Sequence, residues 1–203
     1  MAAKTSYHHG NLRQSLIDGA IALIGEAGFE QLSLRQVARR VGVSHNAPYR
    51  HFADREALLA AVSEEGFQAL CSALEAAQHG ISADSPQRLQ ALGRAYVEFA
   101  LANPAHYRVM FGQYRCDLSQ YPDLAKASQQ SFEVLVDTIA KGQSAGIFRA
   151  ADPVDMARVA WSLVHGQSML ALDNKLQIKS GKDFETFLQF SSQMLFEGLG
   201  TGH

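Results

Sequence analysis

The sequence contains little cysteine, no long apolar run and no large excess of either charge. Its 203 residues include two cysteines, Cys71 and Cys116, which are too few for a disulfide framework or a dense thiolate site. Polar or charged residues interrupt every apolar stretch before the roughly 18 residues that a membrane-spanning helix needs. The first nine residues lack the hydrophobic segment of a signal peptide. We therefore expect a soluble, cytoplasmic protein in a reducing setting, with no membrane partner.

Motifs for catalysis and cofactor binding are also missing. The chain has no glycine-rich phosphate loop, no metal-ligand spacing and no nucleophile elbow. His8 and His9 are adjacent but have no third ligand near them in the sequence, which makes a poor metal site. We expect no enzyme activity, no metal and no cofactor.

The composition is that of a folded protein whose charge is divided unevenly along the chain. Apolar residues make up 47% and charged residues 19%, which excludes bulk disorder. The net charge is -2, yet residues 1–55 carry seven basic and four acidic groups, whereas residues 56–203 carry 11 basic and 16 acidic groups. Such a split is compatible with one end of the molecule facing phosphate.

Apolar residues recur at helical spacing, and no run alternates with the period of a strand. Gly28 can end a first helix in a left-handed conformation, Ser33 and Asp54 are good N-caps, and Asp152-Pro153 is a favourable helix start. The expected fold class is all-α. The spacing predicts helices at about 12–27, 34–41, 44–52, from 55 towards Gly80, 86–102, after Pro104, 122–145, from 153 and from 183.

Residues 33–55 have the pattern of a helix-turn-helix. Two short helices meet at Gly42, where the turn needs a positive φ, and Ala38 offers the small side chain that steeply crossing helices need. Apolar residues such as Phe52 would fix the second helix so that its first residues enter a DNA major groove. The alternative is a plain helical hairpin in a bundle. That alternative does not explain the polar, basic and aromatic face of residues 44–51, so we favour recognition of duplex DNA.

This segment resembles the DNA-binding region of the TetR family of bacterial regulators. The string Tyr49-Arg50-His51-Phe52, the residue Arg55 and the segment 7–13 match the family pattern, and the match covers residues 7–62 or so. Arg55 stands where the family more often has lysine, which keeps the charge but changes the head group. Pro48 removes an amide donor one turn into the expected recognition helix.

The resemblance implies two domains. An N-terminal three-helix helix-turn-helix DNA-binding domain would span residues 1–56, with the fourth helix leading onward from about residue 54. A C-terminal helical bundle for dimerisation and ligand binding would span residues 57–203. Within it, residues 103–111 and 161–166 resemble the ligand-binding type named for its Trp-His-Gly string.

Contacts with DNA are implied position by position. Ser33, Tyr49, His51 and Arg55 would touch phosphates, with Arg35 as a further candidate. The residues after Ser44 would lie over base edges, where Asn can bond adenine twice, Ala can meet a thymine methyl and His can donate to guanine. Arg50 would serve either role. The candidate DNA-binding residues are Ser33, Arg35, Ser44, His45, Asn46, Ala47, Tyr49, Arg50, His51 and Arg55.

The family also implies an apolar pocket for a small-molecule effector in the C-terminal half. Few fixed charges fall among the candidate positions, which favours an apolar or aromatic effector. A lining rich in Met and aromatic residues is equally what a plain core looks like, so both interpretations stay open. The candidate ligand-binding residues are Tyr96, Phe99, Tyr107, Met110, Phe111, Trp161, His165 and Met169.

The expected function is a ligand-responsive transcription repressor that binds a palindromic operator as a homodimer and is released by its effector. An architectural DNA-binding protein without an effector stays open, as does a helical-bundle enzyme or carrier. The dimer would form through the last two long helices, which supply more apolar surface than one thin domain can bury. The large residues expected there are Trp161, Leu172, Phe184, Phe187, Leu188 and Leu195.

Overall fold

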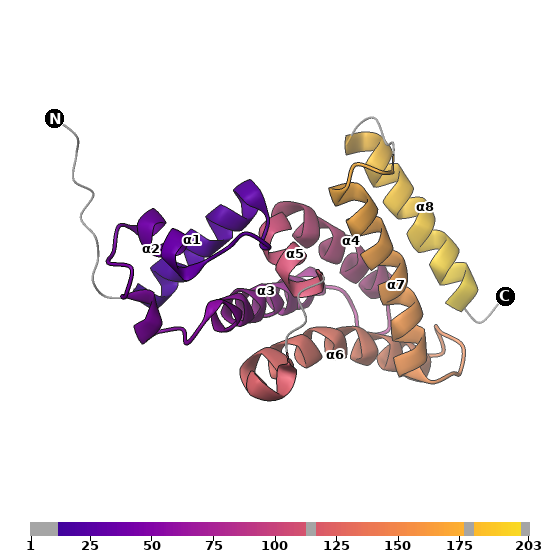
Figure 1. The fold of residues 1–203 in the computed structure, drawn as a ribbon. Helices are drawn as coiled ribbons and strands as arrows, with labels where there is room; N and C mark the ends of the chain where they lie inside the picture. The colour runs from indigo at the N-terminus through magenta and orange to yellow at the C-terminus, as the bar shows by residue number, and fades with distance from the viewer. Residues whose placement is uncertain (1–11, 113–116, 177–180, 200–203) are drawn as a thin grey trace. The chain divides into compact units, whose positions relative to one another are not determined.

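The computed structural model describes residues 12–112, 117–176 and 181–199, and in these residues it contains helices and loops but no strand (Figure 1). The all-α prediction is confirmed. Cys116 and residues 7–11 of the matched N-terminal string lie outside the described residues. In the part of the chain that the structure describes, no helix is both long and apolar enough to cross a lipid bilayer.

Most of the helices lie within about two residues of the expected positions. The segment 44–52 differs from the prediction, and a short 3₁₀ helix at 118–120 was not predicted. In chain order the elements are α1 (Leu12–Ala27), α2 (Leu34–Val41), the 3₁₀ helix η1 (Pro48–Arg50), α3 (Arg55–Ala77), α4 (Gln87–Ala102), α5 (Pro104–Phe111), the 3₁₀ helix η2 (Leu118–Gln120), α6 (Pro122–Ser144), α7 (Pro153–Leu172) and α8 (Gly181–Leu199).

The chain folds as two compact units. The N-terminal unit comprises residues 1–65 and 105–124, and the C-terminal unit comprises residues 66–104 and 125–203. The division therefore passes through α3, and it assigns nearly all of α5 to the N-terminal unit. The functional boundary between residues 56 and 57 that the family resemblance implies stays a prediction.

Local signals explain where α1 and α2 begin and end. Gly28 has φ 79° after the last turn of α1, and its N–H donates to the carbonyl of Ile24. The Ser33 hydroxyl accepts the N–H of Gln36 at 3.3 Å, which satisfies a donor at the start of α2. Gly42 ends α2 with φ 74°, a conformation that costs other residues more.

The core of the N-terminal unit includes α5 as well as the first three α-helices. Leu16, Val37 and Leu59 are fully buried in it, and Ala105 and Val109 of α5 belong to the same cluster. A helix that sequence analysis assigned to the ligand domain is thus packed into the helix-turn-helix core.

The recognition segment is not the α-helix that the sequence predicted from Ser44 to about Phe52. Residues 45–47 form a turn, closed by the bond from Ala47 N to Ser44 O at 2.9 Å, and a single 3₁₀ turn follows at Pro48–Arg50. Pro48 has no N–H to donate to the Ser44 carbonyl, so the i to i−4 bond of an α-helix cannot form there.

The C-terminal unit is built around the packing of α4 against α7. Gly93 of α4 lies at this contact: a Cβ at that position would lie 3.5 Å from Cγ1 of Val164, which is an ordinary van der Waals distance. The buried side chain of Gln78 is hydrogen-bonded in this unit. The Gln78 Oε1 accepts from Arg88 Nε at 2.8 Å and from the Thr138 hydroxyl at 2.9 Å.

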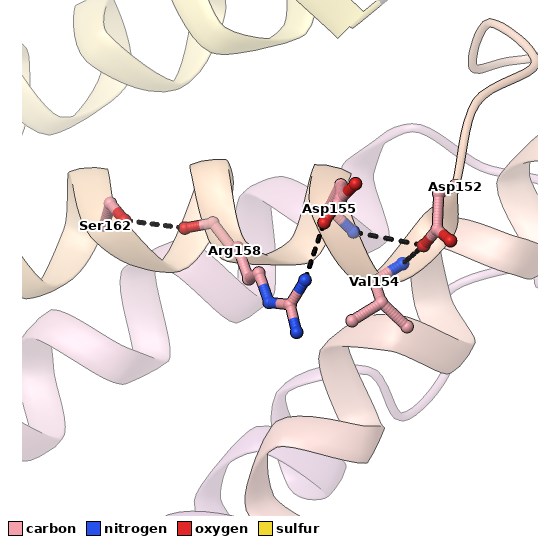
Figure 2. Close-up of polar contacts among 5 residues, drawn as sticks. All are labelled: Asp152, Val154, Asp155, Arg158 and Ser162. Carbon is pink, nitrogen blue, oxygen red and sulfur yellow. Dashed lines mark hydrogen bonds and ion pairs between the residues drawn. The ribbon is translucent and has the colours of Figure 1, made fainter.

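The start of α7 agrees with the prediction (Figure 2). The Asp152 carboxylate accepts the N–H groups of Val154 and Asp155 at 2.7 and 3.2 Å, and Pro153 occupies the first helical position. One turn later, Arg158 pairs with Asp155 at 2.7 Å, and the Ser162 hydroxyl donates to the Arg158 carbonyl. A cap of this kind contributes about 1 kcal/mol.

Candidate nucleic-acid interface

The segment 44–51 carries exposed polar side chains on an apolar anchor. Pro48 is fully buried, Phe52 is 3% exposed, and the Arg13 guanidinium lies 5.6 Å from the centroid of the Phe52 ring. Ala47 is half-buried. These contacts fix the backbone of the segment against the core. The exposed residues are Ser44, His45, Asn46, Tyr49, Arg50 and His51.

The remaining DNA candidates lie at the starts of α2 and α3. The Ser33 hydroxyl is engaged by Gln36, accepting its N–H and donating to its side-chain oxygen at 2.8 Å. The Arg55 Nη2 donates to the Phe29 carbonyl at 2.6 Å, and its Nε is buried without an acceptor among the described residues. Arg35 is exposed. The structure therefore gives Ser33 and Arg55 a positioning role, and their contacts with phosphate stay predictions.

Positive charge on the N-terminal unit is only partly neutralised. Arg40 pairs with Glu26 at 2.5 Å, and this contact lowers the pKa of the Glu26 carboxyl and raises that of Arg40. Within the described residues, no carboxylate pairs with Arg35, Arg39 or Arg50. Arg39 was missed by sequence analysis, although its place in the last, exposed turn of α2 beside Gly42 could have indicated it.

A cleft of about 250 Å³ lies beside the recognition segment within the N-terminal unit. Arg13, His51 and Phe52 line one part of it, and residues 120–124 line another. None of the candidate ligand-binding residues lines this cleft.

The structure divides the candidate ligand-binding residues between the two units. Tyr107, Met110 and Phe111 lie on α5 in the N-terminal unit, where Tyr107 is fully buried and its ring lies 4.8 Å from that of Phe111. The other candidates lie on α4 and α7 of the C-terminal unit: Tyr96, Phe99, Trp161, His165 and Met169.

Three of the candidates on α4 and α7 share hydrogen bonds. The Trp161 Nε1–H donates to the Tyr96 hydroxyl at 3.0 Å, and that hydroxyl lies 3.0 Å from Nδ1 of His165. Because an indole N–H can only donate, the Tyr96 hydroxyl accepts it, and the same hydroxyl can donate to Nδ1 when that nitrogen carries no proton. Burial lowers the pKa of His165, which favours the neutral ring that this arrangement needs. Phe132 packs edge-on against Trp161.

The C-terminal unit exposes large apolar side chains on its last two helices. We use the term apolar face for Val159 and Leu170, on one side of α7, together with Phe190 and Met194, on one side of α8, which are between 43% and 60% exposed. The sequence predicts other residues for this role. That prediction is wrong for Leu188, which is 7% exposed because it packs inside its own unit, and the remaining five are half-buried.

Two family models match the chain. One is described as bacterial regulatory proteins of the tetR family and matches residues 16–62. The other, a tetracyclin repressor-like C-terminal domain, matches residues 89–194, which is more than half of the chain. The chain belongs to the TetR family.

This TetR chain is similar to two solved structures from Rhodococcus. It is 35% identical to a protein with unknown function from Rhodococcus sp. RHA1, with a TM-score of 0.84 over 98% of this chain and 100% of that one. A bacterial regulatory protein in the tetR family from Rhodococcus RHA1 shares the fold, with 24% identity and a TM-score of 0.73 over 94% of this chain and 98% of that one.

A curated relative is the HTH-type transcriptional regulator Mb1846 of Mycobacterium bovis. It is 30% identical over 132 residues, which are 64% of this chain and 55% of that protein. The chain thus spans about half the length of this relative. The matching family model describes bacterial regulatory proteins and this relative is named a transcriptional regulator, which agrees with the prediction that the chain is not an enzyme.

Proposed function

We propose that this TetR chain is a sequence-selective DNA-binding regulator whose segment 44–51 reads the major groove. The observation that carries the proposal is the exposure of His45, Asn46 and Arg50 on a backbone anchored by the buried Pro48 and Phe52. Asn can bond adenine twice and Arg can bond guanine twice, and both need a backbone held at a fixed angle to the groove.

Phosphate contacts set the affinity and the register on DNA. Arg35 and Arg39 are suited to this role because they are exposed and no described carboxylate competes for them. Tyr49, which is 50% exposed, and His51 can donate to phosphate oxygens beside the base-reading residues. Ser33 and Arg55 would then support these contacts by holding the starts of α2 and α3.

The regulator acts as a homodimer through the apolar face in this proposal. On α7 the half-buried Leu163 and Gly166 lie between Val159 and Leu170 at i+4 and i+7, so one helical stripe is continuous. A Cβ at Gly166 would meet no atom within 4 Å, which leaves room for a partner helix to approach closely. Burying four large apolar side chains against a second copy would stabilise the dimer.

A small, largely apolar effector bound in the C-terminal unit would lower operator affinity. The Trp161, Tyr96 and His165 cluster supports an aromatic site of the Trp-His-Gly type. Its helix α4 ends at Ala102 and is capped by Asn103, and α5 begins at Pro104 and places Ala105 and Val109 in the helix-turn-helix core. A displacement of α4 would therefore be transmitted to the reading segment through a short covalent connection. A preference of about 2.7 kcal/mol between two conformations shifts their ratio a hundredfold.

A repressor in the cytoplasm is the expected role, because a dimer that occupies an operator blocks access to it. The architectural alternative differs in one respect only: its DNA affinity would not respond to any effector. Release of bound duplex by any of a panel of aromatic and lipophilic compounds would exclude it.

The proposed function can be tested by selecting bound duplexes from a randomised pool. We expect an inverted repeat whose half-sites lie about 34–36 Å apart, or further by whole turns. Asn46→Ala should relax the preference at one position in each half-site, whereas Gln129→Ala, an exposed change on α6, should leave the selected sequence unchanged. A pool that shows no enrichment over input would overturn the proposal.

A further inference from the structure

The C-terminal unit contains two buried glutamines. The side chain of one is hydrogen-bonded, and the amide nitrogen of the other has no acceptor among the described residues. Gln78 is 8% exposed, and its side chain bonds Arg88, Thr138 and the Leu74 carbonyl. Gln167 of α7 is 5% exposed, yet its Nε2 has no hydrogen-bond acceptor among the described residues.

Elsewhere in this unit, buried polar side chains are satisfied. Ser131, Ser168 and Ser191 each donate to a backbone carbonyl of their own helix at 2.8–3.0 Å. A buried amide donor without an acceptor loses its hydrogen bonds to water and gains none in the protein, which costs free energy. A leucine or methionine of similar size has no such donor and would not carry this cost. The side chain of Gln167 is therefore costly to the unit on its own, and an acceptor from outside the described chain would offset that cost.

The residues around Gln167 restrict which chemical group could accept a hydrogen bond from its amide. On α7 its neighbours one turn away are Leu163, Val164, Leu170 and Ala171, and no Asp, Glu, Lys or Arg occurs from Val159 to Leu172. On α4, which packs against α7, Arg94 is exposed and already paired with Glu98 and Glu185. A carboxylate brought here would have no counter-charge, so the acceptor should be neutral.

We propose that Gln167 is the hydrogen-bond donor of an effector subsite that takes neutral, lipophilic molecules carrying a carbonyl oxygen. Gln167 lies one turn along α7 from Leu163 and Leu170, and at 5% exposure its amide is held away from bulk water. This inference rests on the proposed effector response and adds to it the chemical class of the effector and the residue that selects it.

The test uses two probes of the same shape, acetophenone and ethylbenzene, which differ by the carbonyl oxygen, and benzoate as the charged analogue. Their dissociation constants are measured by calorimetry on the full-length protein and on Gln167→Leu, without DNA. The ratio of the ethylbenzene constant to the acetophenone constant should fall about five- to tenfold in Gln167→Leu, the value of one neutral hydrogen bond. Benzoate should bind the native protein more weakly than acetophenone.

Stability provides an independent readout with a matched control. Gln167→Leu should raise the melting temperature by about 2–4 °C, because it removes an unsatisfied donor. Gln78→Leu should lower the melting temperature, because it strips partners from Arg88 and Thr138, and it should preserve the discrimination between the probes. Gln167→Met repeats the first change with a less branched side chain.

Several results would overturn the inference. They are failure of acetophenone to bind the native protein, discrimination that survives Gln167→Leu, or a lower melting temperature for that variant, which would show that solvent or a partner chain already satisfies the amide. Because these measurements use protein without DNA, their failure is distinct from failure of the proposed function, which a missing operator would show.

Discussion

Segment 44–51 of the N-terminal unit and the apolar face of the C-terminal unit are both exposed, but they expose opposite chemistry. The first presents His45, Asn46 and Arg50 above the buried Pro48 and Phe52. The second presents Phe190 and Met194, with 60% and 53% of their surface accessible, together with Val159 and Leu170.

The difference shows how the outer surface, rather than the core, distinguishes the two units. Both bury leucine, valine and alanine from amphipathic helices, and either core would suit many helical proteins. Hydrogen-bonding groups on a fixed backbone suit base edges and phosphates. Large exposed apolar side chains suit a surface that another chain covers. Substitutions that change one of these surfaces and leave the other intact can therefore test the two roles separately.

The largest effect is expected from breaking the apolar face. The double change Phe190→Glu and Met194→Glu places charge where a second chain would pack, so the dimer should dissociate at micromolar concentration. Operator affinity should then fall about a hundredfold or more, because the two reading segments are no longer linked and each half-site must be bound separately. Sedimentation and duplex binding measure both effects. Gln189→Glu adds charge to an adjacent exposed position and should change neither. A double variant that stays dimeric would place the interface elsewhere.

Two changes in the N-terminal unit should separate base reading from phosphate binding. Asn46→Ala should cost about 1–3 kcal/mol against one base pair per half-site and little against other sequences. Arg35→Ala should weaken binding to all sequences and reduce the salt slope by about one unit. Anisotropy titrations with operator and unrelated duplex at several salt concentrations measure both. Arg55→Ala is less informative, because Arg55 also bonds the Phe29 carbonyl. Identical sequence profiles for the two variants would mean that the segment is misassigned.

A smaller effect is expected from the titration of His165 in the C-terminal unit. Burial lowers its pKa from the usual 6.5, so the unfolded chain binds more protons than the folded chain once the pH falls below about 6.5. Stability should therefore be complete above that pH and decline as the pH falls towards the folded pKa. His165→Gln keeps a side-chain oxygen for Tyr96 but cannot titrate, so its melting temperature should fall less between pH 7.5 and 5.0. Equal pH dependence of the two proteins would contradict this assignment.

The smallest effect is expected from Glu26, which holds Arg40 at the surface of the N-terminal unit. Glu26→Gln should release a positive charge, so nonspecific duplex affinity at low salt should rise a few-fold and the salt slope should steepen by up to one unit. Thermal stability should hardly change, because exposed ion pairs contribute little. Glu56→Gln removes an acid from the first turn of α3 and serves as the control. An unchanged salt slope would show that Arg40 does not reach DNA.

Helix ends were predictable from sequence because their causes are local. Ser33, Gly42 and Asp152 act through bonds or dihedral angles within a few residues, and the structure confirms each of them. The prediction of an α-helix at residues 44–52 was wrong, and the reason is also local. Pro48 has no N–H for an α-helical hydrogen bond, and a good N-cap at Ser44 does not compensate for that loss.

Contacts between helices were not predictable from one sequence. Periodicity shows that Leu188 and Phe190 lie on different sides of a helix, but not which side the neighbouring helices cover, and the structure buries only Leu188. The placement of α5 in the helix-turn-helix core likewise depends on contacts of Ala105 and Val109 with residues far away in sequence. The unsatisfied amide of Gln167 is visible only when its neighbours in space are known.

The central claim is that one dimer carries two reading segments at a fixed separation, and inserting base pairs into the selected operator tests it most directly. Five added base pairs between the half-sites rotate one of them by about half a turn of the duplex. The account predicts that affinity falls to that of a duplex with a single half-site. Affinity that is unchanged by the insertion would contradict it, because the two segments would then bind independently.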